Sequence, residues 1–223
     1  LKKRFEAATG GRIVEAYGLT ESGVLAMGPI YGPWKEGAVG LPTPDTIIRI
    51  VDIETGTREM APGEAGEIVA QAPHLMKGYW RRDEATAEMF RDGWLHTGDI
   101  GHLDEDGYLF ITSRKKDLIK PSGHQVYPGE VEEIIQQHPS VQEVAVAGIP
   151  DPYQVEAVKA WVVLKPGARA TSEEIQGHCQ KSLASYKVPK FIEFRESLPK
   201  SMIGKVLRRI LQEEEIQKPG RMN

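Results

Sequence analysis

Four short segments of this 223-residue chain carry side chains that could bind a nucleotide or react with one, and they occur in the order Tyr17–Ser22, Thr97–Asp99, Ser113–Asp117 and Pro199–Lys205. The first segment places an aromatic ring, a glycine, a hydroxyl and a carboxylate within six residues. A flat ring can stack on a nucleobase, and the oxygens of Thr20 and Glu21 are the kind of ligand that Mg²⁺ prefers. Taken alone, the segment also fits a plain turn with an exposed glutamate.

The second and third segments offer an acid and a cluster of bases. The carboxylate of Asp99 could accept hydrogen bonds from two ribose hydroxyls, and it follows Gly98 at what we predict to be a turn. On the tripeptide alone, a turn-forming aspartate is the simpler interpretation. Arg114 lies in a basic run that either faces solvent or meets phosphate groups.

Lys205 closes the fourth segment and could act on a phosphate. Its ammonium is a compact charge that could offset negative charge developing on phosphorus. We expect the last helix to begin at about Lys205, where a cation is mildly unfavourable. That cost makes a functional reason more credible against the plain alternative of a lysine facing water, and Lys200 is the less favoured candidate.

The segments must be positioned by elements of two kinds. We predict a buried strand-and-loop region over residues 1–30, and strands over 46–51 and 66–71. A short helix is expected over 84–90, and a hairpin turn at Asp104–Gly107. Residues 40–112 therefore read as a mainly β unit.

The composition changes after Ser113–Lys116. Helices are predicted from Pro128, from Thr171 with the spacing of a capping box, and from about Lys205. Strands are predicted over 141–148, 158–164 and 188–194, and the tail 218–223 is expected to fray. The fold class is α+β: a mainly β part of a large domain over 1–113, followed by a small α+β domain over 114–223.

Composition excludes several classes of protein. The net charge of −4 and the pI near 5.9 argue against a non-specific nucleic-acid binder. The single cysteine, Cys179, cannot form an internal disulfide, and we interpret it as a core residue. The histidines show no metal-ligand spacing. No apolar run approaches the ~18 residues of a membrane span, so we expect a cytoplasmic protein, with peripheral membrane association left open and the oligomeric state unpredicted.

The four segments, in this order, resemble those of the adenylate-forming superfamily, which includes acyl-CoA synthetases, luciferases and the adenylation domains of peptide synthetases. Tyr17–Gly23 together with Gly204–Arg209 looks most like the bacterial long-chain fatty-acid–CoA ligases. The resemblance implies that 1–113 is the C-terminal part of the large AMP-binding domain and 114–223 the small mobile domain. The family's first phosphate loop, which is rich in Ser, Thr and Gly and ends in Lys, is not in this chain, so we expect the C-terminal part of an enzyme.

The resemblance also implies a site for ATP and Mg²⁺. In the family the tyrosine matching Tyr17 packs on adenine, the hydroxyl matching Thr20 contacts phosphate, and the carboxylate matching Glu21 holds Mg²⁺. The residues expected to contact ATP or AMP are Tyr17, Gly18, Thr20, Asp99, Ile111 and Arg114. Thr20 and Glu21 are the expected Mg²⁺ ligands, and with Lys205 they form the expected catalytic set.

Later steps are carried over in the same way. Lys116 matches the family's hinge, although Ser113 stands where the family usually has a glycine. Lys205 matches the lysine that grips the acyl carboxylate and the α-phosphate. The loop beginning at Ser122 matches the loop that enters for thioester formation, where the residues expected to serve the coenzyme A step are Lys120, Ser122 and Gly123.

The function expected from the resemblance is an ATP-dependent acid–thiol ligase of fatty acid metabolism, which activates a carboxylate as acyl-AMP and transfers it to coenzyme A. Two alternatives stay open. The first is a superfamily member that activates an aromatic acid or an amino acid. The second is a chain that is catalytically inactive in isolation and serves as a partner-binding module.

Overall fold

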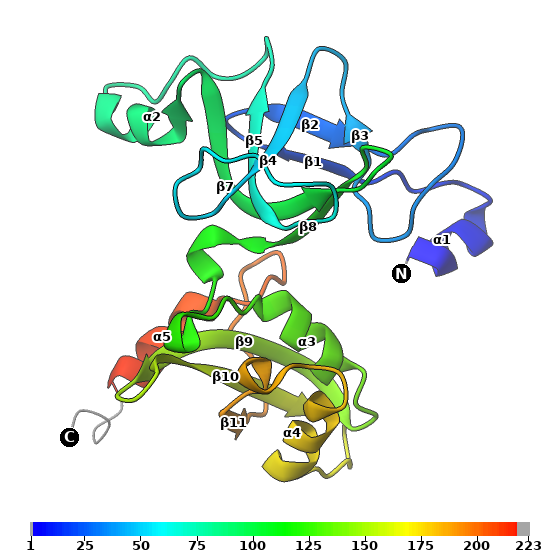
Figure 1. Ribbon diagram of the computed structural model, residues 1–223. Coiled ribbons are helices and arrows are strands. Elements are labelled where there is room, and N and C mark those ends of the chain that lie inside the picture. The colour runs from blue at the N-terminus through cyan, green and yellow to red at the C-terminus, as the bar shows by residue number, and fades with distance from the viewer. Residues whose placement is uncertain (1, 218–223) are drawn as a thin grey trace. The chain divides into compact units, whose positions relative to one another are not determined.

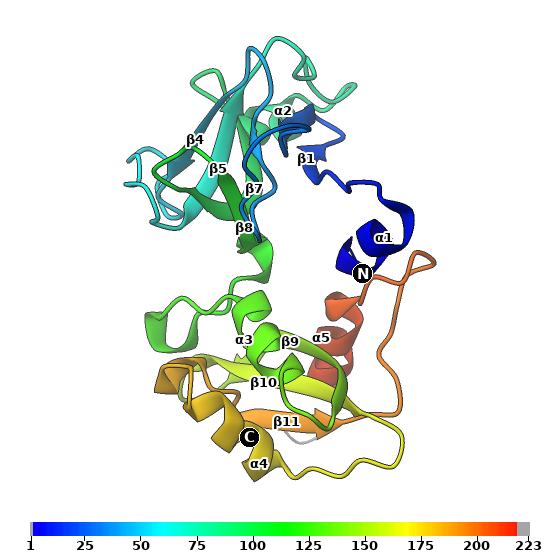
Figure 2. The same cartoon turned by 90° about the vertical axis from the view of Figure 1, so that its right-hand side faces the viewer.

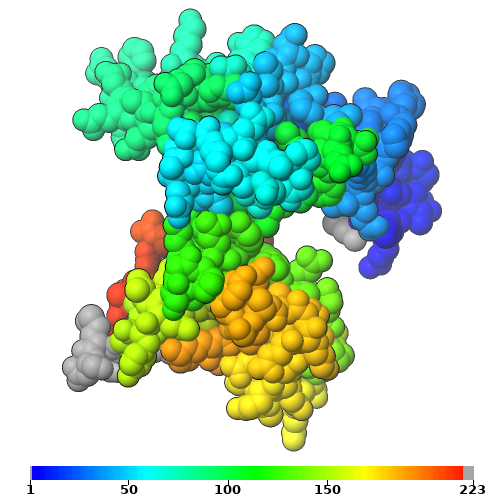
Figure 3. All heavy atoms as spheres, in the orientation of Figure 1, coloured from blue at the N-terminus to red at the C-terminus, as the bar shows by residue number. Residues whose placement is uncertain are grey.

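The structure of the protein is a computed structural model that describes residues 2–217 (Figures 1 and 3). The chain forms two compact units, Leu1–Lys115 and Lys116–Asn223, so the division lies two residues beyond the boundary we placed after Ser113. The tail 218–223, which we predicted to fray, lies outside the described residues. Over residues 2–217, no helix is both long enough and apolar enough to cross a bilayer.

The first unit contains two antiparallel sheets that share one apolar core. One sheet has the order β1-β2-β3, and the other has the order β4-β5-β7-β6 with β8 also paired to β7 (Figure 1). Leu25 from the first sheet packs with Ile48, Ile68 and Leu109 from the second. The elements are α1 (Lys2–Thr9), β1 (Ala16–Leu19), β2 (Gly23–Met27), β3 (Leu41–Pro42), β4 (Ile47–Val51), β5 (Gly66–Gln71), α2 (Asp83–Met89), β6 (Phe90–Arg91), β7 (Trp94–Leu103) and β8 (Leu109–Arg114).

The second unit is built on a long antiparallel pair, β9 and β10, to which β11 adds in parallel. Alternation along the strands gives this sheet two apolar faces. One face packs against α3 and α4, and the other packs against α5, so β9 lies between α3 and α5 in Figure 2. The elements are η1 (Lys115–Asp117, at the junction), η2 (Pro121–Gly123), α3 (Pro128–Gln136), β9 (Val141–Asp151), β10 (Val155–Leu164), α4 (Ser172–Gln180), η3 (Ser185–Lys187), β11 (Phe191–Phe194) and α5 (Arg208–Gln217).

Most predicted elements are confirmed, and so is the α+β class. The strand over 66–71 and the hairpin turn at 104–107 are present. The capping box is also present: the Glu174 N–H donates to Thr171 Oγ1, and the Thr171 N–H donates to the Glu174 carboxylate. Cys179 lies on the inner face of α4 and is fully buried in the core, as predicted.

Several predictions about elements are wrong. Residues 2–9 form a helix with no buried residue instead of buried strand and loop, because most of the residues there are Lys, Arg, Glu or Ala, which are good helix formers. The last helix begins at Arg208, and Lys205 lies in a hairpin before it. β11 begins at Phe191 because Pro189 has no N–H to donate to a neighbouring strand.

The segment Thr97–Asp99 is not a turn but a bulge inside β7. Glu67 pairs with Ile100 and Val69 pairs with His96, so one residue of β5 faces three residues of β7. Gly98 accommodates this bulge with a φ of +69°, a conformation that favours glycine. The bulge re-aims the side chain of Asp99 relative to a regular strand.

Candidate functional site

Tyr17–Ser22 forms the hairpin between β1 and β2. The turn is held by Ser22, which is fully buried: its Oγ accepts from the Leu19 N–H at 3.1 Å and donates to the Gly23 carbonyl at 2.9 Å. A Cβ on Gly18 would lie 1.9 Å from the Gly23 oxygen, so the close approach of the two strands requires glycine there. Gly18 therefore has a structural reason to be glycine, whatever it contacts.

The hydroxyl of Tyr17 donates a 2.8 Å hydrogen bond to Oδ2 of Asp99 across 82 residues of sequence. Both side chains are buried. Burial raises the pKa of the Tyr17 phenol far above its ordinary value, so the hydroxyl remains a donor at every working pH. The Asp99 N–H in turn donates to Oγ1 of Thr97, which donates to the Ile68 carbonyl at 2.8 Å.

Arg114 lies directly across from Asp99 on β8. The register pairs the two residues, and Nε of Arg114 lies 3.4 Å from Oδ1 of Asp99. The guanidinium is more than half exposed, with 59% of the side chain accessible, so it retains donors for an anion. The structure thus brings Tyr17, Asp99 and Arg114 together. Ile111, also on β8, is 39% exposed and presents an apolar surface.

Glu21 is held by a residue that the sequence analysis did not single out, Tyr79. The Tyr79 hydroxyl donates to Oε1 of Glu21 at 2.6 Å, and this hydrogen bond raises the pKa of the Tyr79 phenol. The Met76 N–H donates to the Glu21 carbonyl at 2.8 Å, which fixes the backbone. Tyr79 lies just before the short helix predicted over 84–90, and no local pattern could identify a contact over 58 residues.

Thr20 and Glu21 fit a magnesium site in which most ligands come from water and a nucleotide. No cluster of three or more His, Cys, Asp or Glu side chains within residues 2–217 is arranged to hold a metal. Glu21 offers one carboxylate on a fixed backbone, and Thr20 next to it is exposed. Mg²⁺ commonly binds through one or two carboxylates and takes its other ligands from water and phosphate. The donor set therefore fits Mg²⁺ carried by a nucleotide, and does not fit an all-protein cage.

An ion pair between a buried glutamate and a partly exposed lysine was also missed, immediately before the proposed hinge. Lys115 Nζ lies 2.8 Å from Oε2 of Glu67, and Nδ1 of His96 lies 3.4 Å from the same oxygen. Burial pushes the pKa of Glu67 upward, but Lys115 and, to a smaller degree, His96 outweigh this effect and hold it below its usual value. The pair ties the end of β8 to β5. A lone glutamate in an apolar strand was the available signal.

In the second unit, the predicted thioester loop contains two consecutive left-handed residues. Ser122 has a φ of +49° and Gly123 a φ of +85°. The strained Ser122 is held because its N–H donates to the Gln154 carbonyl at 3.0 Å. The Lys120 N–H donates to Oε2 of Glu156 at 2.6 Å, while the Lys120 residue itself is exposed.

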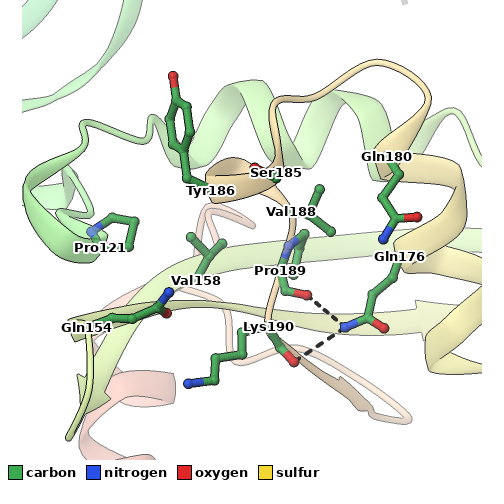
Figure 4. A pocket seen from close by; sticks show the side chains of 10 residues that line it. All are labelled: Pro121, Gln154, Val158, Gln176, Gln180, Ser185, Tyr186, Val188, Pro189 and Lys190. Carbon is green, nitrogen blue, oxygen red and sulfur yellow. Dashed lines mark hydrogen bonds between the residues drawn. The ribbon is translucent and has the colours of Figure 1, made fainter.

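A cleft of about 500 Å³ adjoins this loop (Figure 4). Pro121, the first residue of η2, lines one end, and Tyr186 and Lys190 line others. Gln176 braces the wall, because its Nε2 donates to the Pro189 carbonyl at 2.9 Å and to the Lys190 carbonyl at 3.3 Å. The cleft offers the aromatic ring of Tyr186, the ammonium of Lys190 and several amide groups. In the adjoining loop, a Cβ added to Gly123 would meet nothing within 4 Å, so there is open space around this residue.

Lys205 belongs to a hairpin spanning Pro199–Leu207. Lys200 bridges to Val206 across the hairpin, and Gly204 adopts a φ of +79° near its tip. The side chain of Lys200 pairs with Glu143 at 2.7 Å. Lys205 is exposed, and no carboxylate of residues 2–217 lies within ion-pair distance of its ammonium. Of the two lysines, the structure leaves Lys205 available for a ligand.

Comparison with known proteins agrees in both halves of the chain. The family described as "AMP-binding enzyme" matches residues 1–80, and the "AMP-binding enzyme C-terminal domain" matches residues 130–205. A long-chain-fatty-acid–CoA ligase of Bacillus subtilis is 51% identical over 96% of this chain, and one of Escherichia coli O157:H7 is 46% identical over 95%. The chain spans 38% and 37% of these relatives, respectively.

Solved structures show the same fold. ATP-bound MatB from Rhodopseudomonas palustris superposes with a TM-score of 0.90 at 38% identity, over 97% of this chain and 44% of its own. O-succinylbenzoate coenzyme A synthetase (MenE) from Bacillus subtilis, in complex with AMP, gives a TM-score of 0.79 at 33% identity, over 94% of this chain and 42% of its own.

Proposed function

The chain belongs to the AMP-binding, adenylate-forming enzymes, and from this premise we propose that it is the C-terminal part of an ATP-dependent ligase that joins a fatty acid to coenzyme A. The fatty-acid class is supported by relatives of that name at 46–51% identity. The first unit would be the end of the large AMP-binding domain, and the second the small mobile domain.

The observation that carries the proposal is the carboxylate of Asp99, which is held between the Tyr17 hydroxyl and the guanidinium of Arg114. A carboxylate fixed in this way can accept hydrogen bonds from the two hydroxyls of a ribose, and Arg114 can reach a phosphate. With Tyr17 only 7% exposed, the ring contributes a small stacking surface. Its larger contribution is to hold Asp99 in place. Gly18 and Ile111 would complete the nucleotide-facing surface.

In the first half-reaction, a carboxylate oxygen of the acid bonds to the α-phosphorus of ATP, and the bond to pyrophosphate breaks. Lys205 would offset the charge that develops on the phosphoryl oxygens. Glu21 and Thr20 would hold Mg²⁺, which supplies charge compensation for the triphosphate when bound. Tyr79 would keep the Glu21 carboxylate oriented through its 2.6 Å hydrogen bond.

In the second half-reaction, the sulfur of coenzyme A bonds to the acyl carbon, its proton is lost, and AMP leaves. Ser122 and Gly123 would line the approach of the thiol, Lys120 would assist, and the neighbouring cleft would take another part of the same substrate. Lys116 would be the pivot that exchanges the Lys205 segment for this loop between the two steps. With ATP, coenzyme A and a fatty acid as substrates, the complete protein would act in the cytoplasm and would contact a membrane where the fatty acid is taken up.

The test uses the complete protein from which this chain comes. Pyrophosphate release is measured with ATP and a panel of acids: acetate, decanoate, palmitate, benzoate and a neutral amino acid. Thioester formation is then measured after coenzyme A is added. We expect the highest kcat/KM with the long-chain acid. Preference for benzoate or the amino acid would overturn the fatty-acid assignment, and no release with any acid would overturn the ligase assignment.

The isolated 223-residue chain serves as a comparison. Positioning of the reactants supplies much of the rate in such reactions, and the chain spans less than two fifths of its curated relatives. We expect it to form little or no thioester. Turnover within about tenfold of the complete protein would contradict this expectation.

A further inference from the structure

We propose that Arg208 is a positioning residue for Lys205: its bidentate ion pair with Glu132 fixes the hairpin that presents the lysine. Neither residue was among the expected site residues. The role of Lys205 itself rests on the proposed function, whereas the anchoring of the hairpin does not.

Backbone hydrogen bonds and apolar packing hold the base of the hairpin, whereas its tip is exposed to solvent. The Leu207 N–H donates to the Pro199 carbonyl at 2.9 Å, and the Ser201 N–H donates to the Lys205 carbonyl at 2.8 Å. Leu198, just before the hairpin, is buried in the core beneath α5. Met202, at the tip, is fully exposed. Lys205 therefore stands on a short arm whose direction depends on what holds the base.

Arg208 directly follows that base and opens α5. Its Nη2 lies 2.6 Å from Oε2 and 2.8 Å from Oε1 of Glu132, and its Nε lies 3.1 Å from Oε1. Glu132 belongs to α3, and its Oε1 also accepts from the Val146 N–H of β9 at 2.8 Å. One carboxylate thus joins α3, β9 and the start of α5, which come from different parts of the sequence.

The planar fork of Arg208 gives direction as well as attraction. The apolar contacts of Leu198 and Val206 hold the base against the core, but apolar contacts permit sliding and rotation. A bidentate guanidinium–carboxylate pair sets both distance and angle. The other ion pair of the hairpin, Lys200 with Glu143, is a single contact in which both side chains are partly exposed, so it constrains the arm less.

The same guanidinium also faces the segment beside the proposed pivot. Nη1 of Arg208 lies 3.9 Å from Oδ2 of Asp117, the residue after Lys116. The guanidinium of Arg208 therefore interacts with two carboxylates. One belongs to Glu132 on α3, and the other belongs to Asp117, which follows the proposed pivot. A variant that lacks this charge loosens both contacts within the second unit.

Anchoring can be measured without any activity, by amide hydrogen exchange on the 223-residue chain. In Arg208→Ala, the amides of Ser201 and Leu207 should exchange about tenfold faster or more. The reason is that this variant loses the hydrogen bonds between Arg208 and the charged carboxylate of Glu132, which hold the hairpin in place. The amide of Glu174, protected by the distant capping box, reports whether the unit remains folded. Arg209→Ala is the matched control, since Arg209 is 88% exposed and, among residues 2–217, its ion pair is with Glu213 on its own helix.

Two more conservative variants test the same contact in case Arg208→Ala does not fold. Glu132→Gln keeps an oxygen for the Val146 N–H but removes the charge, and Arg208→Lys keeps the charge but removes the fork. Both should give intermediate exchange at Ser201 and Leu207. Wild-type exchange in Arg208→Ala and in Glu132→Gln would overturn the proposal.

The catalytic consequence is measured in the complete protein through the two half-reactions. Arg208→Ala should slow pyrophosphate release about 10- to 100-fold, a range consistent with displacement of a catalytic group by a fraction of an ångström or more. Thioester formation from supplied acyl-adenylate should change much less, and Arg208→Lys should restore part of the loss. Equal slowing of both half-reactions would show a merely structural role and overturn the positioning role.

The two proposals fail in different ways. A wild-type complete protein that releases no pyrophosphate with any acid refutes the proposed function and removes the catalytic part of this inference. Faster exchange in Arg208→Ala, with Arg209→Ala unchanged, would still support the anchoring. If the wild-type complete protein is active but exchange at Ser201 and Leu207 is unchanged in Arg208→Ala, the anchoring is refuted and the proposed function is not affected.

Discussion

Replacement of Lys205 by alanine in the complete protein should separate chemistry from folding. The lysine is exposed, and no carboxylate of the described part of the chain pairs with it. Its truncation therefore leaves neither a cavity nor a buried partner without a charge. Surface changes of this kind alter the free energy of unfolding by less than about 0.5 kcal/mol, so any loss of activity is a loss of transition-state stabilisation.

The expected size follows from the chemistry assigned to the ammonium. Loss of one preorganised group that stabilises developing charge lowers a rate about 10²- to 10³-fold, equivalent to about 3–4 kcal/mol. We expect Lys205→Ala to slow pyrophosphate release by this factor. Thioester formation from supplied acyl-adenylate should fall less than about tenfold, because phosphoryl charge no longer develops in that step.

Lys200→Ala is the matched control. It removes a lysine from the same hairpin, and with it an exposed ion pair to Glu143 that contributes about 0.2–1 kcal/mol to stability. Its half-reactions should match the wild type within a factor of a few. If Lys200→Ala slows adenylation as much as Lys205→Ala, or if Lys205→Ala slows both half-reactions equally, the assignment of Lys205 is wrong.

Three further outcomes are expected. Lys116→Pro, which fixes φ near about −65° at the proposed pivot, should allow pyrophosphate release but stall thioester formation; normal conversion of acyl-adenylate would place the pivot elsewhere. Tyr17→Phe removes the donor to Asp99 with little change of shape, so it should destabilise the first unit by about 1.5–3 kcal/mol in urea unfolding, and this loss should largely disappear on an Asp99→Ala background, which has no acceptor for the hydroxyl. Burial raises the pKa of the Cys179 thiol from 9.0 to about 11, so the unfolded chain loses this proton first and stability falls between pH 9 and about pH 11; a Cys179→Ala chain should lack that part of the fall in its urea midpoint, and identical pH profiles would contradict the interpretation.

Local patterns in the sequence predicted the elements that are fixed by local physics. The capping box at Thr171 formed with both of its hydrogen bonds, because both partners lie within one helical turn. The hairpin turn at Asp104–Gly107 formed because Asp104 accepts from the Asp106 and Tyr108 N–H groups nearby. The exposed helix α1 was not predicted, because none of its residues is buried and it therefore carries no pattern of core positions.

The candidate site depends instead on contacts between distant segments. Asp99 meets Tyr17 only because β7 bulges opposite Ile68, and the bulge is a property of the pairing between β5 and β7, not of the tripeptide Thr97–Asp99. Tyr79 and Glu67 were missed for the same reason. Each is chemically ordinary until a partner 48 or more residues away is placed beside it.

Lys205 shows how the reason for an assignment can change while the residue stays the same. The resemblance favoured it, and so did the cost of a lysine at the positive end of a helix. The helix begins at Arg208, so the second argument fails. The hairpin supplies a different one. It places Lys200 at the base, where Glu143 uses its charge, and leaves Lys205 without a carboxylate among residues 2–217. The cation at the helix start is Arg208. Glu132 offsets its charge there, and this pair is the proposed anchor of the hairpin that carries Lys205.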